Sequence, residues 1–356
     1  MRFLVKNPHT DQKPLFFVVL AGVNEEKPDA CMHKKILSAF LRLAVSAACV
    51  AGISYVMRDK LQDAVVTLRH GVAWQWFIAA GITFLAAQIL LTQRLLVLLR
   101  AHQIRMSLSK GLVLNFCGLF FNLFLPSAVG GDIAKGVMIA KCTGKSMGAT
   151  TSIIQDRLVG FIAMLVLAGA ALLISGGLDD GTILKALPVG VAVAAALIFF
   201  LFHKPFARNF KWLLHLAPST KIKVLLHDLY HAMHEYKNHK MILFQALLLS
   251  WGGQLCLVLL YYLVAGSLAT WNDPKFYLLA VPASCFISML PSIGGVGVRE
   301  AGILFFLSKI MPGEKALAIS FLVGLLIYGF SLIGGIIYIL QGSLKQDRLG
   351  SGGGVL

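Results

Sequence analysis

Long uncharged apolar runs constrain the fold of this chain more than any other feature. The segment Ala316–Leu340 holds no charged residue, and a helix of about 20 apolar residues crosses the ~30 Å hydrocarbon core of a bilayer. Only 13% of the 356 residues are charged, against about 25% in soluble domains. Outer-membrane strands alternate apolar and polar residues over about ten positions, which these runs do not. The sequence therefore predicts an all-α, polytopic integral membrane protein.

Six apolar runs are long enough to span a bilayer. They are Ile36–Met57, Trp74–Leu99, Leu158–Ser175, Ala186–Phe202, Met241–Ser267 and Ala316–Leu340. Two further runs, Gly111–Leu125 and Phe276–Leu290, would extend only about 22 Å as helices. That length is short of the hydrocarbon thickness, so these two runs either turn back or cross with difficulty.

The distribution of Lys and Arg among the loops favours turning back. If both short runs are re-entrant hairpins and the N-terminus is inside, the cytoplasmic loops hold 21 Lys and Arg and the outer loops hold 8. Eight crossing helices give 13 inside and 16 outside, or the reverse with the N-terminus outside. Cytoplasmic loops carry the excess of positive charge. We expect six full spans plus two re-entrant helical hairpins from opposite faces, with both termini cytoplasmic; eight crossing helices are the alternative.

One transmembrane domain, residues 36–341, is expected between two short ends. Residues 1–35 form a cytoplasmic N-terminal segment, and residues 342–356 form a tail, part of it a Gly-rich linker. A basic segment with an apolar stripe within 207–240 predicts an interfacial helix. The net charge of +16 is expected to contact anionic lipid head groups. We expect no nucleic-acid binding.

The two short runs share an internal repeat. A Leu-Pro-Ser break followed by a Gly pair occurs at Leu125–Ser127 with Gly130 and Gly131, and again at Leu290–Ser292 with Gly294 and Gly295. The offset of 164 residues between the two Gly pairs also relates Lys135 to Arg299. Paired Gly/Pro-interrupted segments in two halves are typical of inverted-repeat transporters with a site near the midplane. Ordinary loop punctuation is the alternative.

These residue types suit an anion site. Pro ends a first half-helix, and the N-terminus of the second presents free N–H groups and a positive dipole end. Lys135 and Arg299 would add full charges. Asp132 and Glu300 supply carboxylates that can pair with the opposite cation when the site is empty.

Other polar residues lie within or beside the apolar runs. Asp156 and Arg157 open the run that starts at Leu158, as a functional pair or a structural ion pair. Arg94, near the end of its run, is expected to extend along apolar surface to water. Asn122 and Gln254 are candidate cargo contacts, with helix-to-helix hydrogen bonding as the alternative. We predict no metal site.

Three motifs carry a family resemblance. They are Phe121–Ser127 with Gly130-Gly131-Asp132, Gln155–Gly160, and Ser292–Glu300. Together they resemble the lysylphosphatidylglycerol synthase transmembrane-region family, which includes the flippase half of bacterial multiple peptide resistance factors, over roughly residues 36–341. The resemblance implies lipid translocation, with the family's polar positions at Asp132, Asp156, Arg157, Arg299 and Glu300. The chain ends soon after its last expected span, so we do not expect an aminoacyl-transferase domain or lysyl-lipid synthesis.

The sequence therefore predicts a flippase-like transporter in a bacterial or archaeal cytoplasmic membrane. Its cargo would be an anionic or amino-modified phospholipid or a polyprenyl-phosphate-type lipid, supplied in some cases by a separate lipid-synthesising enzyme. A transporter of a small water-soluble anion is the alternative, and a membrane-embedded transferase is third. We expect no enzymatic activity and no cofactor, because the chain has neither a nucleotide-binding Gly-x-x-x-x-Gly-Lys-Ser/Thr loop nor a recognisable nucleophile–base pair.

Overall fold

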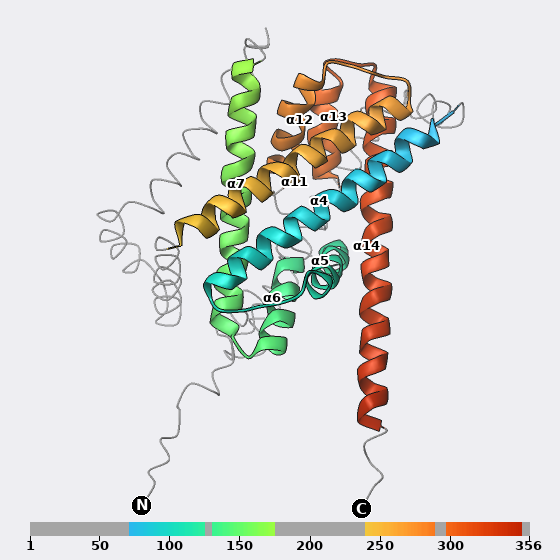
Figure 1. The fold of residues 1–356 in the computed structure, drawn as a ribbon. Coiled ribbons are helices and arrows are strands. Elements are labelled where there is room, and N and C mark those ends of the chain that lie inside the picture. The colour runs from blue at the N-terminus through green and yellow to red at the C-terminus, as the bar shows by residue number, and fades with distance from the viewer. Residues whose placement is uncertain (1–70, 125–129, 175–238, 289–296, 351–356) are drawn as a thin grey trace, which may run out of the picture.

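A computed structural model describes residues 71–124, 130–174, 239–288 and 297–350 (Figure 1). Within these ranges, all regular secondary structure is helical. The helices are α4 (Trp74–Ala101), α5 (Leu108–Phe124), α6 (Gly130–Thr143), α7 (Ser146–Ile174), α11 (Lys240–Ser267), α12 (Pro274–Ile287), α13 (Val298–Leu307) and α14 (Gly313–Gly350).

Four of these helices, α4, α7, α11 and α14, are long and apolar enough to cross a membrane. Their outer faces expose large apolar side chains, among them Ile78, Ile82, Phe321, Leu325 and Ile336. A soluble monomer rarely exposes contiguous apolar surface on this scale, whereas a helix closes its own backbone hydrogen bonds and can face lipid tails. The chain is a multi-pass, all-helical membrane protein, as its sequence predicts.

The long helices follow the predicted spans with two differences. α7 begins at Ser146, well before the predicted start at Leu158, so Asp156 and Arg157 lie inside the helix and not at its opening. Both charges are paired within the bundle, which lets an apolar helix contain them. α14 continues through the predicted tail to Gly350.

Several predicted segments lie outside the described residues. They are the runs Ile36–Met57 and Ala186–Phe202, the segment 1–35, and the part up to residue 238 of the segment 207–240 that is predicted to hold the interfacial helix.

Two pairs of short helices lie between the long ones. α5 packs against α6, and α12 packs against α13; Figure 1 shows the first pair near the lower end of the bundle and the second near the upper end. Tyr277 of α12 and Ile303 of α13 are buried in an apolar core that includes residues of α11 and α14. At 17 residues, α5 extends about 25 Å, which is short of the hydrocarbon thickness.

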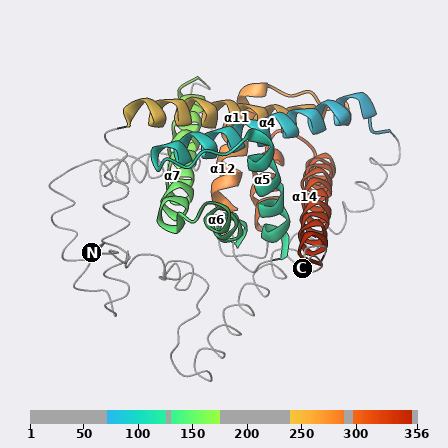
Figure 2. The ribbon, with the colours of Figure 1, turned by 60° about the horizontal axis from the view of Figure 1, so that its bottom comes forward.

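Helices α4 and α11 lie side by side and antiparallel, as Figures 1 and 2 show. The Ala73 N–H before α4 donates to the Ser267 carbonyl at the end of α11 over 2.8 Å. Both helices have 28 residues. After each, a non-glycine residue adopts positive φ, Gln103 at 55° and Ala269 at 52°, and the next amide, of Ile104 or Thr270, bonds back to the helix over 3.1 and 3.0 Å. Helices α4 and α11 thus end in the same way.

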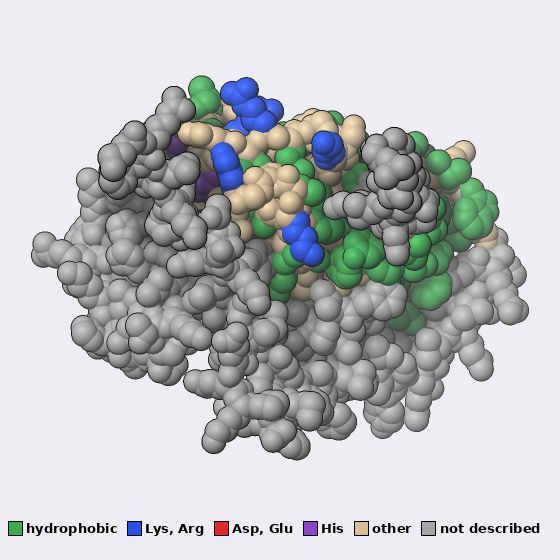
Figure 3. Space-filling view, turned by 90° about the horizontal axis from the view of Figure 1, so that it is seen from below, with side chains coloured by type: hydrophobic (Ala, Val, Ile, Leu, Met, Phe, Trp, Pro, Cys, Tyr) green, Lys and Arg blue, Asp and Glu red, His purple; other side chains and the backbone are tan. Residues whose placement is uncertain are grey.

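The two ends of the bundle differ in composition. The lower end, seen in Figure 3, is where α4 and α6 end and α7 and α11 begin, and Lys and Arg side chains lie on its described surface. Exposed cations at these helix ends are Arg100, Lys141, Lys145 and Lys240, and Lys110 lies exposed in the first turn of α5. At the opposite end, Trp76 and Trp271 stack edge to face with ring centroids 5.0 Å apart. Tryptophan is enriched at membrane–water interfaces.

Candidate functional site

The start of α6 packs directly against the backbone of α5. The Gly131 N–H donates to Asn122 Oδ1 over 2.7 Å, so one of the amides left unpaired at a helix start has a partner. A Cβ at Gly131 would collide with the Gly118 carbonyl oxygen. Gly131 thus permits a close approach of the α5 and α6 backbones. Gly130 and Gly131 are the first residues of α6, and they are buried.

Asp132, in the first turn of α6, is the centre of an ion network. Its carboxylate is 3% exposed and contacts Lys135 Nζ at 2.9 Å. The Arg157 Nε of α7 pairs with its other oxygen. The Lys135 stem lies over Gly118, where a Cβ would approach its carbons to 2.8 Å. Asp132 thus pairs with cations of its own half, and the expected pairing with the cation of the opposite half is wrong.

Arg94 of α4 extends this network to two further helices. Its Nε and Nη2 donate to the two carboxylate oxygens of Asp156 over 2.6 and 2.8 Å. Its Nη1 donates to Ser250 Oγ of α11 over 2.8 Å. A Cβ at Gly160 would lie 3.1 Å from Nη1, so this glycine makes room for the guanidinium. Arg94 is buried, and the expectation that it extends to water is wrong, because a bidentate carboxylate offsets its desolvation.

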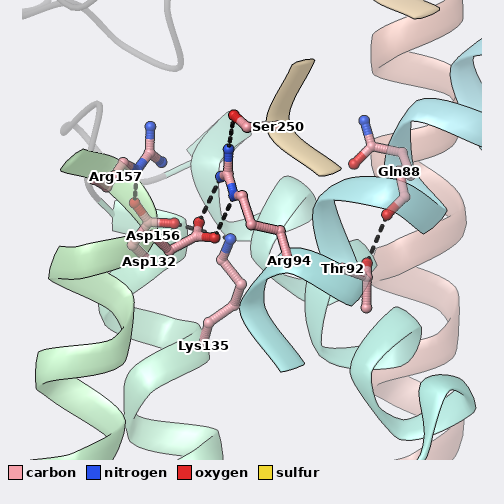
Figure 4. Close-up of polar contacts among 8 residues, drawn as sticks. All are labelled: Gln88, Thr92, Arg94, Asp132, Lys135, Asp156, Arg157 and Ser250. Atoms are coloured by element: carbon pink, nitrogen blue, oxygen red, sulfur yellow. Dashed lines mark hydrogen bonds and ion pairs between the residues drawn. The ribbon is translucent and has the colours of Figure 1, made fainter. Parts of the chain in front are cut away.

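The network carries one surplus positive charge. Three cations (Arg94, Lys135 and Arg157) face two carboxylates (Asp132 and Asp156). The Arg157 side chain is 39% exposed, whereas that of Arg94 is 9% exposed. Figure 4 shows Arg157 on one side of the two carboxylates and Arg94 and Lys135 on the other. Among the three cations of the network, Arg157 therefore has the largest exposed fraction of its side chain.

A second ion pair lies at the start of α13. Glu300 pairs with Arg299 and accepts the Gly297 N–H over 2.8 Å, which caps the helix. The Tyr328 hydroxyl of α14 donates to Glu300 Oε1 over 3.2 Å, and Arg299 Nη2 lies 3.3 Å from that hydroxyl. One cation and one carboxylate leave this pair neutral.

Comparison with known families identifies the chain. The family described as "Lysylphosphatidylglycerol synthase TM region" matches residues 39–335. The chain belongs to this family. No curated protein and no solved structure matches the chain. Membership relates it to membrane proteins that handle lipids.

Geometry accounts for two of the motifs that carry the resemblance to this family. In the motif Gln155–Gly160, Asp156 binds Arg94, Arg157 binds Asp132, and Gly160 leaves space for Arg94. In the earlier motif, Asn122 accepts the Gly131 N–H, and Gly131 permits the α5–α6 contact. Both motifs therefore contribute to the network. They supply charged residues, a hydrogen-bond acceptor and glycines that leave space for their neighbours.

The other predicted site residues do not all join this network. Gln254 of α11 is buried, and its Oε1 has no hydrogen-bond partner among the described residues. Gly294 and Gly295 lie outside the described residues. Within the described ranges, no group of His, Cys, Asp and Glu is arranged to hold a metal ion.

Sequence analysis missed Arg94, Ser250 and Tyr328 as members of polar clusters. A buried charge inside an apolar run signals a partner, and this signal was present for Arg94. No signal marks Ser250, because serine is common in membrane helices.

Proposed function

We propose that this protein is a lipid flippase-like transporter, not an enzyme. It moves a lipid with an anionic head group between leaflets: an anionic or amino-modified phospholipid, or a polyprenyl-phosphate-type lipid. The head group binds beside Arg157 and Lys135, while the acyl or prenyl tails stay in the bilayer. The partners are membrane lipids and, where the cargo is made in the same membrane, a separate lipid-synthesising enzyme.

The surplus cation at Arg157 is the observation that carries this proposal. An ionised side chain within a membrane protein is costly, on the order of 3 kcal/mol at a helix centre, and is retained where it is paired or functional. Arg94 and Lys135 are largely buried by their partners. The Arg157 side chain is 39% exposed and contacts Asp132 through Nε among the described residues, and guanidinium forks suit phosphate oxygens. The neutral Arg299–Glu300 pair lacks this surplus, so we place the head group in the first half.

The arrangement of helices supports a transport mechanism. We propose that α5–α6 and α12–α13 are re-entrant hairpins entering from opposite faces and that the halves are inverted repeats. The antiparallel α4 and α11, with matching caps, support this. Rocking of one half against the other would expose the site to each leaflet in turn.

Charge sets the proposed orientation. We propose that the basic lower end lies in the cytoplasm, by the positive-inside rule, and that the membrane is a bacterial or archaeal cytoplasmic membrane. The Lys and Arg counts of the loops support cytoplasmic termini.

A transporter of a small water-soluble anion is the second candidate, because the same cations would bind a free phosphate ester. Family membership favours lipid. The test is reconstitution into vesicles with two cargoes: fluorescent phosphatidylglycerol, followed by dithionite quenching, and radiolabelled glycerol 3-phosphate, followed by uptake. Accelerated movement of the lipid without uptake of the soluble ester supports the proposal. Uptake of the soluble ester without lipid movement would contradict the proposal and favour a transporter of water-soluble anions.

A further inference from the structure

Asp156 and Arg157 are consecutive residues of α7 with different partners. Side chains at neighbouring helix positions point about 100° apart. Asp156 points to Arg94 of α4 and Arg157 points to Asp132 of α6, as Figure 4 shows. Arg94 contacts both oxygens of the Asp156 carboxylate, at 2.6 and 2.8 Å, so Asp156 has its own cation on α4. Arg157 pairs with a different carboxylate, Asp132.

We propose that Arg94 is a positioning residue that reserves Arg157 for the head group by neutralising Asp156. The inference rests on the proposed function, since it assigns which residue keeps the head-group site positively charged. Arg94 itself is 9% exposed and all three of its donor nitrogens are engaged. It therefore acts through Asp156 and not by touching the lipid.

The charge balance explains why the pair matters. With Arg94 present, Asp156 is neutralised, and Asp132 alone cannot neutralise both Lys135 and Arg157. Without Arg94, the Asp156 carboxylate loses its own cation and lies next to Arg157 in the chain. The network then has two cations and two carboxylates, and no charge is left for an anion.

This mechanism predicts rescue by a second substitution. Arg94→Gln lowers the network charge from +1 to zero, whereas Arg94→Gln combined with Asp156→Asn returns it to +1. A purely structural pair would show no such recovery of affinity. The matched control is Arg100→Gln, which removes an exposed arginine from the same helix.

The experiment measures binding of fluorescent phosphatidylglycerol to full-length protein in detergent micelles, with phosphatidylcholine as the reference lipid. Thermal unfolding of each variant is recorded in parallel. We expect Arg94→Gln to weaken phosphatidylglycerol binding at least about tenfold, the scale of one lost charge-assisted contact. The double variant should bind within about threefold of wild type, even where its melting temperature is lower. Arg100→Gln should bind as wild type.

Three results overturn the inference. The first is unchanged binding by Arg94→Gln. The second is a folded double variant that binds as weakly as Arg94→Gln. If Arg94→Gln does not fold, Asp156→Asn and the double variant are compared instead: both keep a surplus of positive charge and should bind, and weak binding by the folded double variant contradicts the inference. The third is wild-type protein that does not prefer phosphatidylglycerol, a result that removes the proposed function itself.

Discussion

Arg94 shows how single residues determine this site. A lone arginine at a membrane-helix centre costs on the order of 3 kcal/mol, and removing one partner from a buried pair costs about 3–5 kcal/mol. Here each of the three nitrogens of the Arg94 guanidinium donates a hydrogen bond to Asp156 or Ser250. Gly160 provides the space for it. The four residues come from three helices, so their chemistry depends on tertiary structure.

Gly131 tests the contact that positions Asp132. Gly131→Ala introduces a Cβ into the Gly118 carbonyl, and overpacking of this kind costs about 1–3 kcal/mol. We expect a lower melting temperature by thermal unfolding in detergent. Gly329→Ala is the matched control, because a Cβ there meets nothing within 4 Å and alanine favours a helix. Equal melting temperatures for the two variants would contradict the assignment of this contact.

Arg299 tests the difference between the two ion pairs. Arg299→Gln removes the partner of Glu300 and a contact to Tyr328, so we expect a loss of stability of about 1–3 kcal/mol. Phosphatidylglycerol affinity in the folded fraction should stay within about threefold of wild type. A large loss of affinity at unchanged stability would instead place the head group at Arg299.

At the scale of elements, apolar run length predicted most of the described helices. α4, α11 and the start of α14 lie close to the predicted bounds, because long apolar runs leave few alternatives. The predicted start of α7 at Leu158 was wrong, because charged residues such as Asp156 and Arg157 resemble the end of a span until their partners are known. Partners on α4 and α6 are contacts that one-dimensional patterns do not encode. The candidate site was predicted in part for the same reason: its residue types were predicted, but its pairings were not.

The hairpin topology has a direct test in cysteine labelling. In a background without native cysteines, we introduce Cys at Lys110 and Lys141, which flank the α5–α6 pair, and at Asp273 and Ser308, which flank α12–α13; all four are exposed. Re-entrant hairpins predict that a membrane-impermeant thiol reagent added outside cells labels both members of the second pair and neither of the first. Labelling of only one member within either pair would show that its helices cross the membrane.

At the scale of the whole molecule, α4 and α11 end in the same way, but the two described ion clusters differ in charge. The cluster around Asp132 has a surplus cation, whereas Arg299 and Glu300 form a neutral pair. An inverted repeat with one charged site can present that site to both leaflets without duplicating it.

Lipid flux with and without the Arg157 side chain most directly tests the proposal that Arg157 binds the head group. In vesicles containing fluorescent phosphatidylglycerol, wild-type protein should accelerate movement between leaflets above protein-free vesicles. Arg157→Gln should lower the rate at least about tenfold, because it removes the surplus charge, whereas Arg100→Gln should retain the wild-type rate. Equal rates for Arg157→Gln and wild type, at equal amounts of inserted protein, would contradict the central claim that Arg157 binds the head group.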